Sequence, residues 1–596
     1  MTVDELLPAS ALDRLASLIA AVNRAEASAL DLTESVSIYF LRNFTVEPIE
    51  PFLKYHLLRA GICPAITYGA YGTITQELLA EDAPLRKHAP DFIVFALMLD
   101  TLDPSFGNAH WTAEKAIEQL EGMLDLAMAK TRGLIALNTF FPPFYALHGL
   151  TAGTALTNTD EEVLKLNRYI RDIAVQHTSR FVLIDWERLL RLGGKAESLD
   201  YRFWHLSKAP FKKRFLDLYA REICKAARAL KGKAKKCVVL DCDNTLWGGV
   251  VGEESIDGIA LDRNEWPGSA YYDFQRTLLG LYDRGVLIAL CSKNNEADVW
   301  DVLDQHPHCL LQRKHLAAWR LNWYNKAANL TALAEELNLG MDAFVFVDDN
   351  PAECELIRQV HPEVTVLQVP EALYEYQTFL LKDGYFDTLA LSTEDRYRSL
   401  MYQQEKVRVR DRERFVDLRA YLQSLQIVAR IGPGEVRDFS RIAQLTQKTN
   451  QFNLTTRRYS EADIQELAQG SDSAVFSLSV EDRFGAMGLT GVFIARNQAG
   501  IGVIDTMLLS CRVLGRDLEL ALADRCMATL EEKWSIERWE AEYIPTRKNA
   551  HVACFWEKLC FEIMHEAESH KRYATSVKPR PKHYEAFISV EKGRRE

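Results

Sequence analysis

The chain has 596 residues, of which 48% are hydrophobic and 26% charged, as in ordinary globular proteins built from several domains. Its formal net charge of −12 disfavours broad nucleic-acid binding, and no apolar run reaches the roughly 18 residues of a membrane helix. The 11 cysteines form no C-x-x-C pair, and the N-terminus lacks the basic region of a secretory signal. We therefore expect a cytoplasmic protein without structural zinc or a disulfide scaffold.

Residues 1–230 are predicted to form a doubly wound α/β domain, because short apolar runs alternate with segments of helical periodicity. The apolar runs are 36–40, 64–67, 92–97, 134–137 and 181–185, and the helical segments include 112–130 and 160–174. This region resembles SGNH hydrolases, which place a nucleophilic serine after the first strand. Thr45 stands at that point, with His205 as a candidate base, but no G-x-S signature is present. A degenerate scaffold that binds a partner is the favoured interpretation.

Residues 231–390 carry polar side chains at the ends of three apolar runs, as expected for a parallel sheet. The run 237–240 leads to Asp241, Asp243 and Thr245. The run 286–291 leads to Ser292, Lys293 and Asn294, and the run 344–347 leads to Asp348 and Asp349, with Lys326 between them in the chain. Carboxylates in this arrangement can bind Mg²⁺, while hydroxyl, amide and ammonium groups can hold a phosphate.

The order of these groups along the chain, namely nucleophile, hydroxyl, cation and acidic pair, resembles the haloacid dehalogenase (HAD) phosphatase superfamily. The resemblance implies that Asp241 is the metal-ligating nucleophile that forms an aspartyl phosphate and that Asp243 transfers a proton. It implies that Asp241, Asp243, Asp348 and Asp349 bind Mg²⁺, with Asp349 the stronger ligand of the acidic pair and Asp348 orienting Lys326. The predicted phosphate-binding residues are Thr245, Ser292, Lys293, Asn294 and Lys326.

Longer motifs at 241–253, 290–295, 347–353, 447–458 and 508–516 resemble the FkbH-like family. The resemblance implies that the glyceryl group of 1,3-bisphosphoglycerate loses phosphate and passes as a thioester to an acyl carrier protein with a phosphopantetheine arm. The basic segment 231–236 is interpreted as a solvated charge run, with a docking patch for an acidic carrier as the alternative.

Only 47 positions separate Thr245 from Ser292, and a helix over 269–284 fills much of that interval. This spacing leaves little room for a large mobile cap domain. Closure over a substrate is therefore expected from short loops or from another domain. One candidate is the loop over 248–268, which is rich in glycine and acidic residues.

Thioester formation from an acyl phosphate favours a thiol nucleophile, and three cysteines lie inside motifs: Cys242, Cys291 and Cys511. Cys242 ranks first because it lies between the catalytic carboxylates, although two aspartates are poor neighbours for a thiolate. Cys511 has the more favourable local field, beside Arg512 and Arg516. Direct transfer to the carrier thiol, with no enzyme thioester, is the alternative.

Residues 391–596 are predicted to form a third α/β domain that resembles GNAT acyltransferases. The segment 393–425 reads as a charged helix; strands follow at 488–495, 502–510 and 539–543, and helices extend to 531 and through 558. Arg512 and Gly515 match the GNAT signature that cradles coenzyme A, but Asp517 would repel a pyrophosphate. The predicted acyl and pantetheine site comprises Cys511, Arg512, Gly515, Arg516 and Asn549. His551 could deprotonate a pantetheine thiol, but a residue on a helix face is the favoured interpretation.

Two other functions remain open from the sequence. A Mg²⁺-dependent phosphomonoesterase with inert appended domains would turn over phosphate esters without a carrier. A carrier-binding scaffold with vestigial sites is the second, and the intact acidic residues argue against it.

Overall fold

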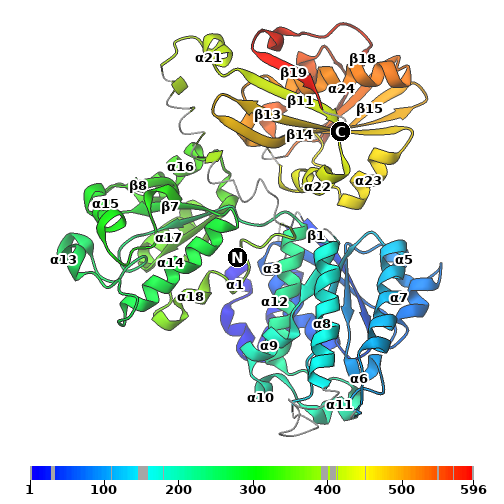
Figure 1. The fold of residues 1–596 in the computed structure, drawn as a ribbon, viewed down its shortest axis with the longest axis vertical. Helices are drawn as coiled ribbons and strands as arrows, with labels where there is room; N and C mark the ends of the chain where they lie inside the picture. The colour runs from blue at the N-terminus through cyan, green and yellow to red at the C-terminus, as the bar shows by residue number, and fades with distance from the viewer. Residues whose placement is uncertain are drawn as a thin grey trace. The chain divides into compact units, whose positions relative to one another are not determined.

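The computed structural model describes residues 3–28, 32, 34–108, 110–144, 159–178, 180–390, 401–402, 404, 408, 411–412, 414–449, 451–546, 549–567 and 569–593. The chain divides into two compact units, 1–232 with 387–390, and 233–386 with 391–596. Within the second unit lie two separate sheets (Figure 1). The three-domain boundaries at 230 and 390 therefore stay a prediction. No helix within the described ranges combines the length and the apolar character needed to cross a membrane.

The first unit is a parallel five-stranded sheet in the order β2-β1-β3-β4-β5. Its strands are β1 (Glu34–Arg42), β2 (Ile62–Tyr68), β3 (Phe92–Ala96), β4 (Leu134–Asn138) and β5 (Phe181–Ile184). One face is covered by α2 (Leu15–Ala27), α3 (Glu50–Arg59), α9 (Trp186–Gly193) and α12 (Lys213–Leu230). The other is covered by α4 (Ile74–Leu79), α5 (Pro84–His88), α7 (Glu114–Lys130) and α8 (Thr159–Gln176). Shorter elements are α1 (Val3–Leu6), η1 (Ala9–Asp13), η2 (Glu47–Ile49), α6 (Leu99–Leu102), α10 (Lys195–Ser198) and α11 (Tyr201–Ser207).

The second sheet is also parallel, in the order β10-β9-β6-β7-β8. Its strands are β6 (Cys237–Leu240), β7 (Leu287–Ser292), β8 (Leu316–Leu321), β9 (Phe344–Asp348) and β10 (Thr365–Gln368). One face packs on α13 (Val251–Gly258), α14 (Gly268–Asp283), α15 (Glu296–Gln305) and α18 (Tyr376–Phe379). The other packs on α16 (Lys326–Glu336) and α17 (Pro351–Val360). Turns of 3-10 helix lie at η4 (Arg313–His315), η5 (Met341–Ala343) and η6 (Leu373–Glu375).

The third sheet is mostly antiparallel, in the order β17-β18-β16-β15-β14-β13-β11-β19, with β12 added beside β15. Its strands are β11 (Ile427–Pro433), β12 (Phe452–Asn453), β13 (Ser473–Asp482), β14 (Gly485–Gln498), β15 (Ile501–Leu509), β16 (Arg538–Tyr543), β17 (Glu562–Ala567), β18 (His570–Ser576) and β19 (Ile588–Lys592). Helices α21 (Leu418–Ser424), α24 (Leu518–Trp534) and α25 (Phe555–Lys558) contribute to one core, and α22 (Phe439–Lys448) and α23 (Glu461–Gln469) to the other. The 3-10 turns are η7 (Val436–Asp438), η8 (Cys511–Val513), η9 (Ala550–Val552) and η10 (His583–Ala586).

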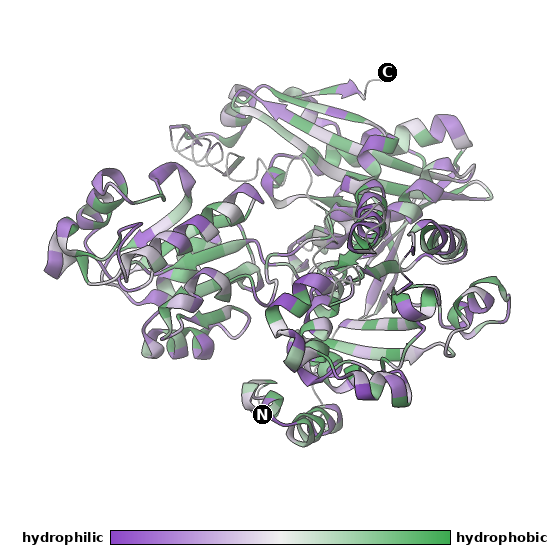
Figure 2. Cartoon of the chain, turned by 60° about the horizontal axis from the view of Figure 1, so that its bottom comes forward, coloured by the Kyte–Doolittle hydropathy of each residue, from purple (hydrophilic) through white to green (hydrophobic). Residues whose placement is uncertain are grey.

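Figure 2 shows hydrophobic residues concentrated along the strands, while the helices carry both hydrophobic and hydrophilic positions. Strands covered on both faces bury successive side chains, so they read as continuous apolar runs in the sequence. All five residues of β3 and all four of β6 are buried. This pattern is the reason that the runs of the sequence locate the strands, and the predicted α/β class with parallel sheets is confirmed.

Two expected elements differ in the structure. The predicted loop over 248–268 contains α13, a helix interrupted at Ser255, where φ is 60°. The first part of the predicted charged helix over 393–425, residues 393–400, lies outside the described residues, and its last part holds α21, from Leu418 to Ser424.

Candidate active site

The carboxyl ends of β6 and β9 meet where the order of the second sheet reverses, and three carboxylates gather there. The backbone N–H of Asp241 donates to the carbonyl of Val347 at 3.0 Å, which extends the pairing of the two strands by one residue. One ligand atom each from Asp241, Asp348 and Asp349 lies within 4.8 Å of the others. Open α/β sheets bind their ligands at such a reversal of strand order.

Lys326 supplies the positive charge of this cluster. It begins α16, and its Nζ lies 2.9 Å from Asp241 Oδ1 and 2.6 Å from Asp348 Oδ2. The side chain is buried, which alone would lower its pKa, but Asp241 and then Asp348 hold the pKa of Lys326 above its usual value. The ammonium group is therefore fixed in its charged form between the two strand ends.

Three carboxylates face one ammonium group, so the cluster keeps an excess of negative charge. Burial, and then the charge of Asp241, raise the pKa of both Asp348 and Asp349. A divalent cation would relieve this excess, and carboxylate oxygens are the ligands that Mg²⁺ prefers. The donor set thus fits a Mg²⁺ ion held by Asp241, Asp348 and Asp349, with Asp348 the member that also pairs with Lys326.

Asp243 does not join this group of potential ligands. Its Oδ1 accepts hydrogen bonds from Trp247 Nε1 at 2.9 Å and from the Val251 N–H at 3.1 Å. Its Oδ2 accepts from Asn294 Nδ2 at 2.9 Å. Burial raises the pKa of Asp243 above its usual value. The side chain faces the pocket but is held by neighbouring donors, and Asn294, a predicted phosphate ligand, acts in this structure as one of them.

The turn after β6 depends on Asn244, whose φ of 53° lies in the left-handed region that asparagine tolerates. Its side-chain oxygen accepts from the Gly249 N–H at 2.9 Å, and its carbonyl accepts from the Tyr376 hydroxyl at 2.6 Å. Thr245, the next residue, is completely buried and does not line the pocket. The phosphate contact of Thr245 therefore stays a prediction.

The pocket over the carboxylates is open and has a volume of about 160 Å³. It is lined by Asp241, Asp243, Asn244, Ser292, Lys293, Lys326, Asp348, Asp349, Asn350 and Glu353. Lys293 is half-exposed, and its Nζ lies 2.6 Å from Glu353 Oε1 across the pocket wall. Sequence reasoning gave no role to Asn244, Asn350 or Glu353. Their only signal was their place inside the quoted motifs 241–253 and 347–353.

Neither described motif cysteine is exposed to the pocket. Cys242 packs in the core with Val238 and Leu240, and burial, reinforced by Asp241, raises the pKa of its thiol well above the usual value. Cys291 is also buried, and burial raises its pKa to about 12. These surroundings oppose a thiolate at either position. The side chain of Cys511 lies outside the described residues.

The predicted acyl and pantetheine residues of the third sheet have separate structural partners. Arg516 is buried, and its Nη1 lies 3.4 Å from Asp482 Oδ2, a carboxylate that also takes two bonds of 2.8 Å from Arg408. Arg512 Nε lies 3.3 Å from Ser510 Oγ. Gly515 has a φ of 74° and is exposed before α24.

Asn549 is fully buried and makes four hydrogen bonds with its side-chain amide. Nδ2 donates to the carbonyls of Asn453 and Ile544, each at 2.9 Å. Oδ1 accepts from the Thr546 N–H at 2.7 Å and from the Tyr543 hydroxyl at 3.1 Å. All donor and acceptor positions of the amide are used to join the ends of β12 and β16, so its role in this structure is to hold the backbone.

The remaining candidates are Thr45, His205 and His551. The Thr45 hydroxyl donates to the carbonyl of Ser207 at 2.6 Å, and His205 is exposed on α11. His551 is exposed on the turn after Asn549. The interpretation of the first unit as a degenerate scaffold stays a prediction.

Comparison with known proteins gives a likeness of fold. No family model and no curated protein matched the chain. A crystal structure of the N-terminal part of the protein BF1531 from Bacteroides fragilis, described as containing a phosphatase domain complexed with Mg, matches with a TM-score of 0.57. It is 23% identical and covers 62% of this chain and 98% of its own, so the likeness concerns the fold alone.

Two further structures cover smaller parts of the chain. The ribosomal-protein-S18-alanine N-acetyltransferase from Escherichia coli is 14% identical, with a TM-score of 0.21, over 26% of this chain and 97% of its own. The Arabidopsis thaliana NAA60 structure is 12% identical, with a TM-score of 0.21, over 25% of this chain and 99% of its own. Scores this low support no inference, so the GNAT resemblance stays a prediction.

Replacing Lys326 with methionine is expected to lower the free energy of unfolding by about 3–5 kcal/mol in chelator, because buried carboxylates lose their only close cation among the described residues. Millimolar Mg²⁺ should restore part of this loss. Urea unfolding with and without Mg²⁺ measures both effects, and Lys382→Met, an exposed change in the same region, is the control. Equal stability of the two variants would contradict the central place given to Lys326.

Asn549→Ala is expected to cost about 2–4 kcal/mol of unfolding free energy, because two backbone carbonyls, one of them buried, and one N–H lose their partner. Thermal and urea unfolding of the full chain would show the loss. The control is His551→Ala, an exposed residue on the same turn, which should be within experimental error of the wild type. A stable Asn549→Ala protein would reopen a binding role for this amide.

Proposed function

We propose that the site at the ends of β6 and β9 is a Mg²⁺-dependent centre that acts on phosphoryl groups. The observation that carries the proposal is the gathering of three carboxylates within 4.8 Å, with Lys326 bound to two of them, at the floor of an open pocket. Phosphoryl transfer depends mainly on positioning and on charge neutralisation, and these groups suit both needs. The likeness to the BF1531 structure, described as containing a phosphatase domain complexed with Mg, supports this proposal.

The chain's own groups would divide the work as follows. Asp241, Asp348 and Asp349 would hold the ion, and bound Mg²⁺ would neutralise charge on the phosphate oxygens. Lys326 pairs with Asp241, whose carboxylate would attack phosphorus.

Other groups of the pocket wall would make the remaining contacts. The Ser292 hydroxyl and the Lys293 ammonium line the pocket and would contact the phosphate oxygens. Asp243 also faces the pocket and would give the leaving oxygen its proton.

The finer proposal is that the substrate is 1,3-bisphosphoglycerate and that the product is a glyceryl thioester on an acyl carrier protein. Its support is the resemblance of the motifs at 241–253 and 447–458 to the FkbH-like family, together with the pocket over the carboxylates. The reaction would then proceed in two steps. The carrier thiolate forms a bond to the acyl carbon, and the carbon–oxygen bond breaks as the 1-phosphate leaves.

The second step removes the 3-phosphate. Asp241 would form a bond to its phosphorus, the bond from phosphorus to the C3 oxygen would break, and that oxygen would take a proton. Water then releases phosphate from Asp241, so that one oxygen of this phosphate comes from solvent. Direct transfer to the carrier thiol fits the buried state of Cys242 and Cys291, because neither thiol faces the pocket.

A Mg²⁺-dependent phosphomonoesterase is the second candidate, and the same carboxylates would serve it. Incubation with 1,3-bisphosphoglycerate, Mg²⁺ and a phosphopantetheinylated carrier in ¹⁸O water separates the two. Glyceryl transfer gives one unlabelled and one labelled phosphate for each glyceryl gained by the carrier. A phosphomonoesterase gives labelled phosphate and no mass gain. A reaction without enzyme corrects for spontaneous hydrolysis. If the enzyme releases no phosphate above that background, the scaffold function is the one that remains.

Asp241→Asn should reduce the release of labelled phosphate at least about 100-fold, because the change removes a metal ligand and the attacking carboxylate. The release is measured by mass spectrometry of the phosphate under saturating substrate. Asp301→Asn, an exposed position on α15, is the control and should keep full activity. Near wild-type release by the Asp241 variant would remove this carboxylate from the reaction.

Cys242→Ala should still load the carrier within about twofold of the wild type, since burial and Asp241 oppose a thiolate at this position. The small cavity is expected to cost about 1 kcal/mol of stability. Intact mass of the carrier measures loading, and peptide mapping of the wild type should find no glyceryl group on Cys242. A variant that keeps its fold and its release of labelled phosphate but loses carrier loading would show that Cys242 carries the acyl group.

A further inference from the structure

In the third sheet β15 and β16 are paired over only part of their length, and β15 carries a bulge of one residue where this pairing ends. β15 pairs in parallel with β16 only as far as Ile504 opposite Ala541. On its other side, Ile504 lies opposite Ala495 and Thr506 opposite Ile494, so Asp505 between them has no partner on β14. An extra residue of this kind changes the direction of its side chain and is frequent beside functional sites.

A segment of the same domain lies along β15 beyond its pairing with β16. After β12, the N–H of Leu454 donates to the carbonyl of Met507 at 3.2 Å, and its own carbonyl accepts from the Ile544 N–H at 2.8 Å. Leu454 thus joins β15 to the end of β16 beyond their direct pairing. The chain then turns at Thr456, whose φ is 52°, and brings Arg457 toward Asp505.

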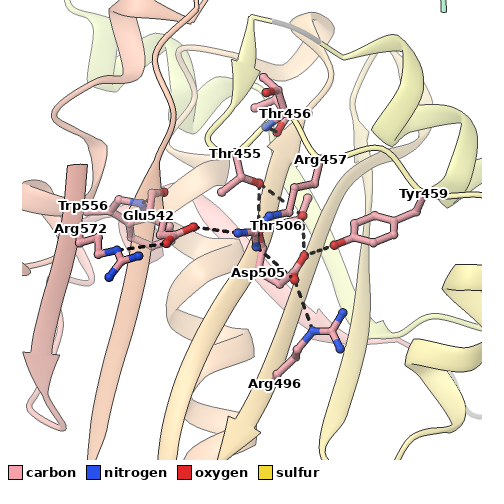
Figure 3. A network of polar contacts seen from close by, with 11 residues as sticks. Thr455, Thr456, Arg457, Tyr459, Arg496, Asp505, Thr506, Glu542, Trp556 and Arg572 are labelled. Carbon is pink, nitrogen blue, oxygen red and sulfur yellow. Dashed lines mark hydrogen bonds and ion pairs between the residues drawn. The ribbon is translucent and has the colours of Figure 1, made fainter. Parts of the chain in front are cut away.

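The carboxylate of Asp505 is the centre of the network in Figure 3. Its Oδ1 accepts from Thr506 Oγ1 at 3.0 Å and from the Tyr459 hydroxyl. Its Oδ2 lies 3.2 Å from Arg457 Nη1 and 3.3 Å from Arg496 Nε. The Asp505 side chain is only 9% exposed, so this buried carboxylate holds two guanidinium groups from different elements in fixed positions.

Both guanidinium groups remain open to solvent, with side-chain exposures of 38% for Arg457 and 45% for Arg496. Arg457 Nη2 also lies 2.8 Å from Glu542, a carboxylate that Arg572 approaches at 3.4 Å. The network therefore has three arginines against two carboxylates. In Figure 3 no interaction reaches the two terminal nitrogens of Arg496, and none is recorded with any residue that the structure describes.

We propose that Arg457 and Arg496 bind the oxyanion group, a carboxylate or a phosphate, of a small-molecule ligand. Guanidinium groups match the planar and bidentate geometry of these anions. One unbalanced positive charge remains to be neutralised, and an anion of one negative charge would complete the network.

Protection from phenylglyoxal, which modifies accessible arginines, tests the site in the full wild-type chain. The probes are inorganic phosphate and acetate, each compared with chloride at equal ionic strength and in the presence of a chelator. Peptide mapping should show Arg496 modified at least about fivefold more slowly with one or both probes. Arg430, which is 43% exposed and also paired with two carboxylates, is the internal control and should be unaffected.

A pair of variants gives an independent measurement. Titration calorimetry should show at least about tenfold weaker binding of the protecting anion to Arg496→Gln than to Arg430→Gln or the wild type. Circular dichroism and unfolding curves check that both variants are folded. Protection by phosphate alone identifies a phosphate group, and protection by acetate alone identifies a carboxylate. Absence of protection by both, or an Arg496→Gln protein that binds like the wild type, would overturn the proposal.

Discussion

The rest of the second sheet depends on one electrostatic constraint, the placement of a single ammonium group against the carboxylates that end β6 and β9. Parallel strands bring Asp241 and Asp348 together because their carboxyl ends meet at one edge. Burial makes this concentration of charge unfavourable unless a cation lies among the oxygens. The start of α16 supplies that cation, since the Lys326 Nζ lies within 2.9 Å of both carboxylates.

Much of this site could be predicted from the sequence, because its signals are local. Each polar group except Lys326 follows a buried run, and a parallel sheet gathers such ends without further information. The environment of Asp243 could not be predicted in this way. Its partners Trp247 and Asn294 approach it only because the chain turns at Asn244 with a positive φ and because β7 ends beside it. These contacts depend on turn geometry that no residue pattern specifies.

The partners of the predicted pantetheine residues could not be predicted from the sequence. The local spacing of these residues agrees with a signature, but in the structure tertiary contacts give their side chains other partners. Arg516 shares Asp482 with Arg408, a residue more than a hundred positions earlier in the chain. Asn549 binds the carbonyl of Asn453, 96 positions away. Pairings over such distances follow from packing, and one sequence does not reveal them. The same holds for Cys242, whose position between two aspartates suggested reactivity and whose side chain packs into the core.

The two polar clusters of the second unit combine carboxylates and cationic side chains in opposite proportions. At the end of β6, three carboxylates share one lysine, and the surplus negative charge suits a cation. Around Asp505, three arginines share two carboxylates, and the surplus positive charge suits an anion. In each case a buried group of the minority charge, Lys326 or Asp505, pairs with several groups of the majority charge, so its role is to position them. Removing Lys326 or Asp505 should therefore disorder a site, whereas removing Asp349 or Arg496 should weaken ligand binding and leave the geometry of the remaining groups intact.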